Sequence, residues 1–179
     1  VPGNAAGLAL AAERFGSMPL AELAKPGIAL GRDGVVINEQ QGYVLEILEA
    51  ILTMTPESAD LYAPEGKPLR TGDIFRYPEM SDALERFGEE GSEPFTSGDI
   101  AVKVAEWVRE RGGNLGLDDL RAYQAIVREP LRIEFRGAQV LMNPPTSSGG
   151  LLISYALGLL ERLGPTSDVE RLVAAMEAS

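Results

Sequence analysis

Cysteine and histidine are both absent from the 179 residues of this chain. Without them the chain has no disulfide, no thiolate nucleophile, no zinc site of the usual kinds and no catalytic triad that uses imidazole. A chain without thiols is stable in either redox environment, so this absence does not identify a compartment. The sequence therefore predicts no metal site, and no residue pattern in it indicates a cofactor.

Long hydrophobic runs are missing as well. The longest apolar segment, Leu151–Leu160, is far shorter than the roughly 18 residues that a membrane-spanning helix needs, and we expect it to be buried core. Hydrophobic residues still make up 45% of the chain, which is typical of a globular domain with a core of its own. The formal net charge of −11 repels phosphate backbones and anionic lipids, so we expect neither nucleic acid nor a membrane among the partners.

Apolar spacing and capping residues predict a mainly helical chain. The expected N-caps are Asn4, Asn38 and Ser97, Pro26 is expected to separate two short helices, and Gly88 is expected to end another. The apolar residues at three-to-four spacing between Val44 and Leu52, and from Ile100 to Val108, are predicted to face the core. The expected helices cover residues 4–15, 18–24, 27–32, a segment that starts at 38, then 57–61, 78–87, 98–111, 117–120, 149–163 and 167–177.

One segment has the alternation of a β-hairpin instead. Residues 131–135 alternate strictly between apolar and charged side chains, residues 138–141 do so more weakly, and Arg136-Gly137 lies between them. The predicted fold class is therefore mainly α with one β-hairpin (α+β), arranged as a single helical lobe over residues 1–179. The chain begins at Val1-Pro2-Gly3 and ends within a helical pattern, and we expect it to be a fragment of a longer protein.

Residues 142–150, Met-Asn-Pro-Pro-Thr-Ser-Ser-Gly-Gly, form the most informative stretch. Two prolines end an extended segment, Ser147 and Ser148 can cap the helix that follows, and Gly149 and Gly150 let its backbone approach a neighbour closely. Free N–H groups at the start of that helix can also bind an anion, although the turn lacks the lysine of a phosphate loop. We expect a capped helix packed on a strand end, with anion binding as the alternative.

Taken residue by residue, the sequence does not reveal an active site. A threonine without a histidine nearby needs its own α-amino group as base, and the first residue here is Val1. The adjacent carboxylates in Glu89-Glu90 and Asp118-Asp119 diverge on a helix and are expected to be solvated. Trp107 is expected in the core, and Arg109 and Arg111 are expected to be helix-end charges rather than a substrate clamp. The threonines of the chain, none of which is its first residue, are Thr53, Thr55, Thr71, Thr96, Thr146 and Thr166.

The order and spacing of these segments resemble the γ-glutamyltranspeptidase family over nearly the whole chain. No single motif is decisive, and residues 38–67 are the part that resembles the family least. Thr96, Asn143 and Thr146 depart from the family's usual residues. The matching segments are residues 1–7, 15–23, Pro26, 29–34, 72–73, 78–91, 95, 98–101, 112–115, 119–123, 128–131, 136–137 and 144–150.

The resemblance implies an N-terminal-nucleophile (αββα) hydrolase fold and a precursor that cleaves itself into a large and a small subunit. The N-terminal threonine of the small subunit would attack a γ-glutamyl amide, typically that of glutathione, and pass the acyl group to water or to an amino acid or peptide. This chain resembles the later part of the large subunit, so no catalytic, cofactor-binding or metal residue of the family is placed on it, and we expect it to be inactive alone. The expected partners are the small subunit and the rest of the large subunit.

Two alternatives stay open at this point. One is a self-standing acidic helical module that binds a basic partner, and the other is a cephalosporin-acylase-like relative with a different acyl group. A fragment should expose a contiguous apolar face, which a homodimer can cover, whereas a self-standing module should not. Family members are often exported, and any export signal would lie upstream of Val1, so the compartment is not predicted.

Overall fold

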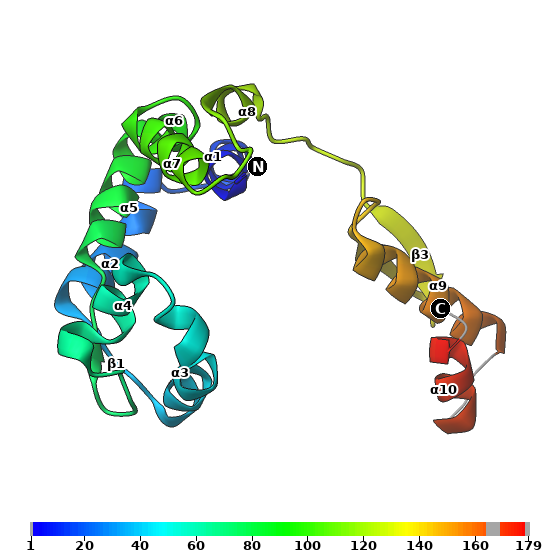
Figure 1. Cartoon of the computed structure of the whole chain (residues 1–179). Helices are drawn as coiled ribbons and strands as arrows, with labels where there is room; N and C mark the ends of the chain where they lie inside the picture. The colour runs from blue at the N-terminus through cyan, green and yellow to red at the C-terminus, as the bar shows by residue number, and fades with distance from the viewer. Residues whose placement is uncertain (1, 164–168, 178–179) are drawn as a thin grey trace. The chain divides into compact units, whose positions relative to one another are not determined.

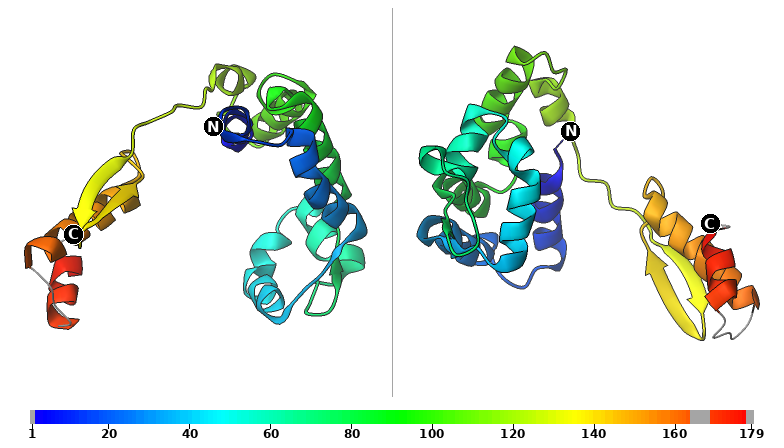
Figure 2. Two further views of the ribbon diagram at one scale, coloured as in Figure 1. Left: turned by 180° about the vertical axis from the view of Figure 1, so that it is seen from behind. Right: turned by 60° about the horizontal axis from the view of Figure 1, so that its bottom comes forward.

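The computed structural model describes residues 2–163 and 169–177 and is mostly helical, with two small antiparallel sheets among these residues (Figure 1). Contacts divide the chain into two compact units, residues 1–125 and residues 126–179. Each unit is described by itself below, and Figure 2 gives two further views. The sequence predicts a single lobe over residues 1–179. It stays a prediction that the two units act together as one lobe of a larger protein.

The first unit contains helices and one very short sheet. Its sheet pairs β1 (Val35–Val36) antiparallel with β2 (Ile74–Phe75). Strands of two residues contain no alternation of apolar and polar side chains, so the sequence predicts only the hairpin at residues 131–141. The remaining elements are α1 (Asn4–Phe15), α2 (Leu20–Asp33), α3 (Glu39–Leu52), α4 (Pro56–Tyr62), the 3-10 turn η1 (Pro64–Gly66), α5 (Pro78–Glu90), α6 (Glu93–Thr96), α7 (Asp99–Glu110) and α8 (Leu117–Ala122).

The packing of α2 against α5 overrides two of the predicted helix ends. Pro26 lies inside one continuous helix, α2, instead of between two short ones. A proline there removes one helical hydrogen bond, but Gly27 and Gly31, one turn apart, leave room for α5 to pack against this face. A Cβ on Gly31 would lie 2.2 Å from the Ser81 hydroxyl, which is fully buried and donates to the Ile28 carbonyl at 3.0 Å.

Gly88 was wrongly expected to end its helix. The helix α5 continues to Glu90 and is capped by Gly91, which has a φ of 67°. Gly88 instead lies at the close crossing of α5 over α2, where a Cβ would come within 2.9 Å of the Ala21 Cα. The glycine therefore permits close helix packing, and the residue three positions later provides the left-handed conformation that ends a helix.

The predicted core face of α7 is wrong by about one residue. Ala101 and Ala105 are buried and form the local core with Leu120 of α8, whereas Trp107 is 44% exposed. The Arg111 guanidinium lies over the Trp107 ring, with its central carbon 3.9 Å from the ring centroid. Small residues face the neighbouring helices because they allow close contact, so the larger apolar side chains of α7 lie at the margin of the interface.

The N-caps agree with the sequence at one position and differ at two. Asn38 caps α3 in a capping box, because its side chain accepts from the Gln41 N–H at 2.9 Å and the Gln41 side chain accepts from the Asn38 N–H at 3.0 Å. The caps of α1 and α7 are Gly3 and Gly98, in place of the predicted Asn4 and Ser97. Glycine reaches the non-helical cap conformation easily. Residue type alone does not show whether a glycine or the polar residue next to it will be the N-cap.

The second unit confirms the predicted hairpin. Strands β3 (Leu131–Phe135) and β4 (Ala138–Met142) pair antiparallel with Ile133 opposite Val140, and Arg136 and Gly137 at the turn both have positive φ. Helix α9 (Ser148–Leu163) packs on this hairpin, and α10 (Val169–Glu177) packs on α9. The predicted start of the last helix at residue 167 lies outside the described residues.

The prediction that Leu151–Leu160 is buried is wrong at its beginning. Leu151, Leu152, Ile153 and Tyr155 are each about half exposed, whereas Ser154 between them is buried. The hairpin covers only one side of α9, so an apolar helix keeps a large part of its surface uncovered. Among the residues that the structure describes, no helix is both long and apolar enough to span a membrane.

Candidate functional site

The turn between β4 and α9 is the site that the sequence singled out, and its backbone is arranged as a helix cap. The Ser147 N–H donates to the Pro144 carbonyl at 3.1 Å, and the Ser147 hydroxyl accepts from the Gly150 N–H at 3.5 Å. The predicted close approach occurs at Gly150, where a Cβ would lie 2.1 Å from the Asn143 carbonyl oxygen, whereas the corresponding position at Gly149 has no heavy atom within 4 Å. The sequence therefore specified both the cap and the glycine contact.

A polar cavity of about 390 Å³ adjoins this turn within the second unit. Its lining contains one cation, Arg128, for which the described residues provide no ion pair. An arginine and a helix start make an anion-compatible surface, but every charged or polar group there is in contact with solvent. Anion binding therefore stays a prediction. The residues that line the cavity are Ile126, Arg128, Asn143, Pro144, Thr146 and Ser147.

The threonines that could serve as nucleophiles act in backbone capping instead. Thr53 donates to the Glu49 carbonyl at 2.8 Å, Thr96 donates to the Ser92 carbonyl at 3.0 Å, and Thr55 accepts from the Ser58 N–H at 3.3 Å. A hydroxyl that donates to a backbone carbonyl at a helix end has no base to receive its proton.

Two of the remaining threonines are described by the structure, and both lie against backbone turns or helices. Thr71 packs against Gly42, where a Cβ would lie 2.1 Å from its hydroxyl oxygen. Thr146 lines the cavity beside Ser147, and Thr166 lies outside the described residues. Thr55 also lies beside the Glu57 carboxylate, whose pKa is lowered first by a backbone N–H and also by the Thr55 hydroxyl. Glu57 is exposed at the start of α4, so this contact belongs to the beginning of a helix.

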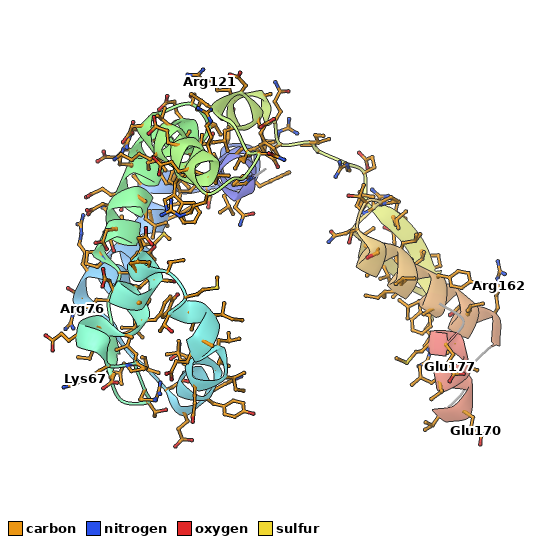
Figure 3. All side chains as sticks on the ribbon, in the orientation of Figure 1. Lys67, Arg76, Arg121, Arg162, Glu170 and Glu177 are labelled. Atoms are coloured by element: carbon orange, nitrogen blue, oxygen red, sulfur yellow. The ribbon has the colours of Figure 1, made fainter. Side chains whose placement is uncertain are left out.

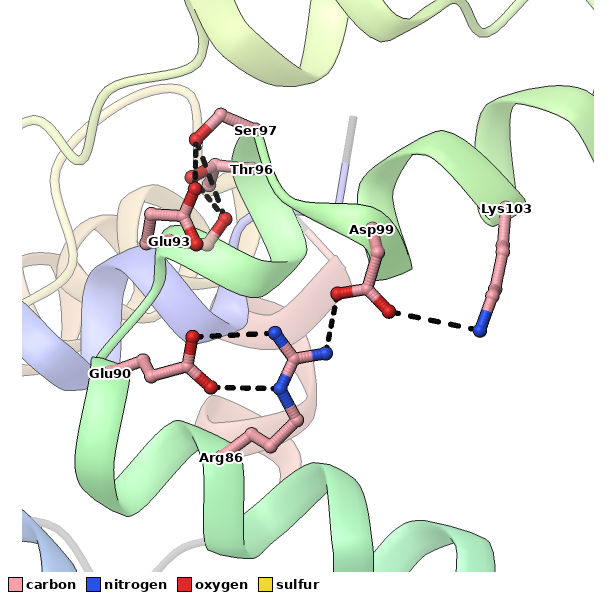
Figure 4. Close-up of polar contacts among 7 residues, drawn as sticks. All are labelled: Arg86, Glu90, Glu93, Thr96, Ser97, Asp99 and Lys103. Atoms are coloured by element: carbon pink, nitrogen blue, oxygen red, sulfur yellow. Dashed lines mark hydrogen bonds and ion pairs between the residues drawn. The ribbon is translucent and has the colours of Figure 1, made fainter.

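One hydroxyl–carboxylate contact was not foreseen from the sequence. The Ser97 hydroxyl lies 3.1 Å from the Glu93 carboxylate and 3.5 Å from the Glu93 carbonyl, one turn away (Figure 4). Both residues are exposed; Glu93 is the first residue of the four-residue helix α6, and Ser97 is its C-cap. The contact closes the last turn of that helix, and the i, i+4 spacing of Glu93 and Ser97 is the signal that could have indicated it.

An ionic junction joins the end of α5 to the start of α7 (Figure 4). The Arg86 guanidinium donates to the Glu90 carboxylate at 2.8 and 3.3 Å and also to the Asp99 carboxylate, and Lys103 lies 3.7 Å from Asp99. The hydrogen bonds from Arg86 lower the pKa of Glu90 and of Asp99 below their usual values. The junction has no uncompensated charge to offer a substrate, so its role is structural.

Several other charged side chains of the described residues lie at the surface. Lys67, Arg76 and Arg121 point outward from the first unit, and Arg162 and Glu170 point outward from the second (Figure 3). Arg111 is the C-cap of α7, as expected of a helix-end charge, and lies against Trp107 and 3.2 Å from Glu57. Asp118 and Asp119 diverge as predicted, since Asp119 accepts from the Gly116 N–H at 2.8 Å while Asp118 is fully exposed. The described residues contain no group of three or more acidic side chains placed to hold a metal ion.

Comparison with known proteins places the chain in one class of enzyme. The structure superimposes on γ-glutamyltranspeptidase from Helicobacter pylori with a TM-score of 0.91 and 24% identity, over 98% of this chain and 53% of that chain. It also superimposes on cephalosporin acylase from Bacillus halodurans with a TM-score of 0.89 and 25% identity, over 99% of this chain and 35% of that one. A mainly helical chain with one hairpin, forming part of an N-terminal-nucleophile hydrolase fold, is therefore confirmed.

The family follows from the sequence comparison. The family model described as gamma-glutamyltranspeptidase matches residues 1–179, which is the whole chain, so the chain belongs to the gamma-glutamyltranspeptidase family. The chain is 35% identical over 161 residues to the glutathione hydrolase proenzyme of Escherichia coli (strain K12), which covers 89% of this chain and 28% of that protein. The chain thus spans less than a third of that relative's length.

Proposed function

We propose that this chain is part of a γ-glutamyltransferase or glutathione hydrolase whose nucleophile is an N-terminal threonine outside residues 1–179. Family membership over the whole chain supports this proposal, as does the small share of the E. coli proenzyme that the chain spans. In this mechanism the threonine's own amine serves as the base, and backbone N–H groups bind the oxyanion. We place both groups outside residues 1–179 and assign this chain a structural role.

The observation that carries the proposal is the uncovered apolar surface of α9. Leu151, Leu152 and Tyr155 lie within two turns on one side of the helix and are each about half exposed. Monomeric soluble proteins rarely leave such a face uncovered. We infer that this face packs against the catalytic part of the parent protein, with the small subunit and the rest of the large subunit as partners. The exposed apolar residues also argue against a self-standing acidic module.

The test is a chromogenic γ-glutamyl anilide assay on two samples at equal molar concentration. One sample is the chain of 179 residues, and the other is the complete protein that contains it. We expect turnover only with the complete protein, together with a new N-terminal threonine that sequencing of its smaller subunit detects. Clear turnover by the 179-residue chain alone would contradict the proposal.

A cephalosporin-acylase-like activity is the second candidate, and the likeness to the Bacillus halodurans acylase supports it. The two activities share a nucleophile and differ in the acyl group that the enzyme accepts. Rates with the γ-glutamyl anilide and with the amide side chain of a cephalosporin, measured on the same complete protein, separate them. A preference for the cephalosporin would replace the first proposal without changing the fold assignment.

A further inference from the structure

No further inference is drawn: the strongest candidate, the polar cavity that Arg128 and the start of α9 line in the second unit, rests on a helix N-terminus around which no polar side chain is buried, and nothing in the described residues points to a ligand there.

Discussion

Close packing of α2 against α5 predicts opposite outcomes for one substitution at two helical glycines. In Gly88→Ala the new Cβ would lie 2.9 Å from the Ala21 Cα, a backbone atom that cannot move unless the two helices separate. In Gly7→Ala, within α1, the new Cβ would have no heavy atom within 4 Å. The two variants make the same chemical change, so they differ only in what surrounds the new methyl group.

Two opposing free energies determine the expected stabilities. Alanine is a better helix former than glycine by about 1 kcal/mol, and this gain applies at both positions. An extra methyl group in a closely packed contact costs about 1–3 kcal/mol, and this cost applies only at Gly88. We therefore expect Gly7→Ala to stabilise the first unit by up to about 1 kcal/mol. We expect Gly88→Ala to lower its stability by about 0–2 kcal/mol.

Urea unfolding followed by tryptophan fluorescence measures this difference. Trp107 is the only tryptophan in the chain and lies in the first unit, so its signal reports on the unit that contains both glycines. The midpoint of Gly88→Ala should fall below that of wild type and that of Gly7→Ala should rise, with unchanged slopes. If Gly88→Ala unfolds at the same urea concentration as Gly7→Ala or higher, the inferred helix crossing is wrong.

Three further outcomes follow from the caps, the turn and the ionic junction. Asn38→Ala removes the N-cap of α3 and should cost about 1 kcal/mol of unfolding free energy, whereas Asn4→Ala, at a position that is not a cap, should change it by less than about 0.5 kcal/mol in the same urea titration. Gly150→Ala places a Cβ against the end of β4 and should reduce the protection of hairpin amides from hydrogen exchange. Gly149→Ala should leave that protection unchanged. Equal protection in the two variants would contradict the close approach at Gly150. Because Arg86 lowers the pKa of two carboxylates, its stabilising effect is present above their ordinary pKa values, near pH 4, and is lost as the pH falls through the lowered ones. The difference in Tm between wild type and Arg86→Met should thus be largest above about pH 5 and shrink in more acidic solution, and a difference independent of pH would refute this assignment.

Local signals in the sequence predicted the elements whose causes are local. Strict alternation and an Arg-Gly turn indicated the β3–β4 hairpin, and Asn38 ahead of an apolar repeat predicted the cap of α3. The turn before α9 followed in the same way, because Ser147 needs only a neighbour three residues later to form its hydrogen bond. That the hydroxyl residues form no catalytic pair stays a prediction, which rests on the lack of histidine in the sequence.

Long-range packing explains the predictions that were wrong. Pro26 and Gly88 have strong local preferences to end a helix, but the contact between α2 and α5 outweighs both. The apolar stripes of α3 and α9 indicated buried faces, but Ile47 and Ile51 of α3 are 61% and 65% exposed. Periodicity cannot show which element covers a face. The family resemblance was visible in the sequence because it depends on the order of many segments and not on any single contact.

The sequence by itself determined that this is a mainly helical chain with one hairpin, related to the γ-glutamyltranspeptidases, because residue types and their spacing are enough for both conclusions. Only the tertiary structure decided which glycines allow helices to cross, which apolar faces stay uncovered, and that a cavity adjoins the turn before α9. Those features depend on distances between segments far apart in the chain, and local periodicity contains no information about them.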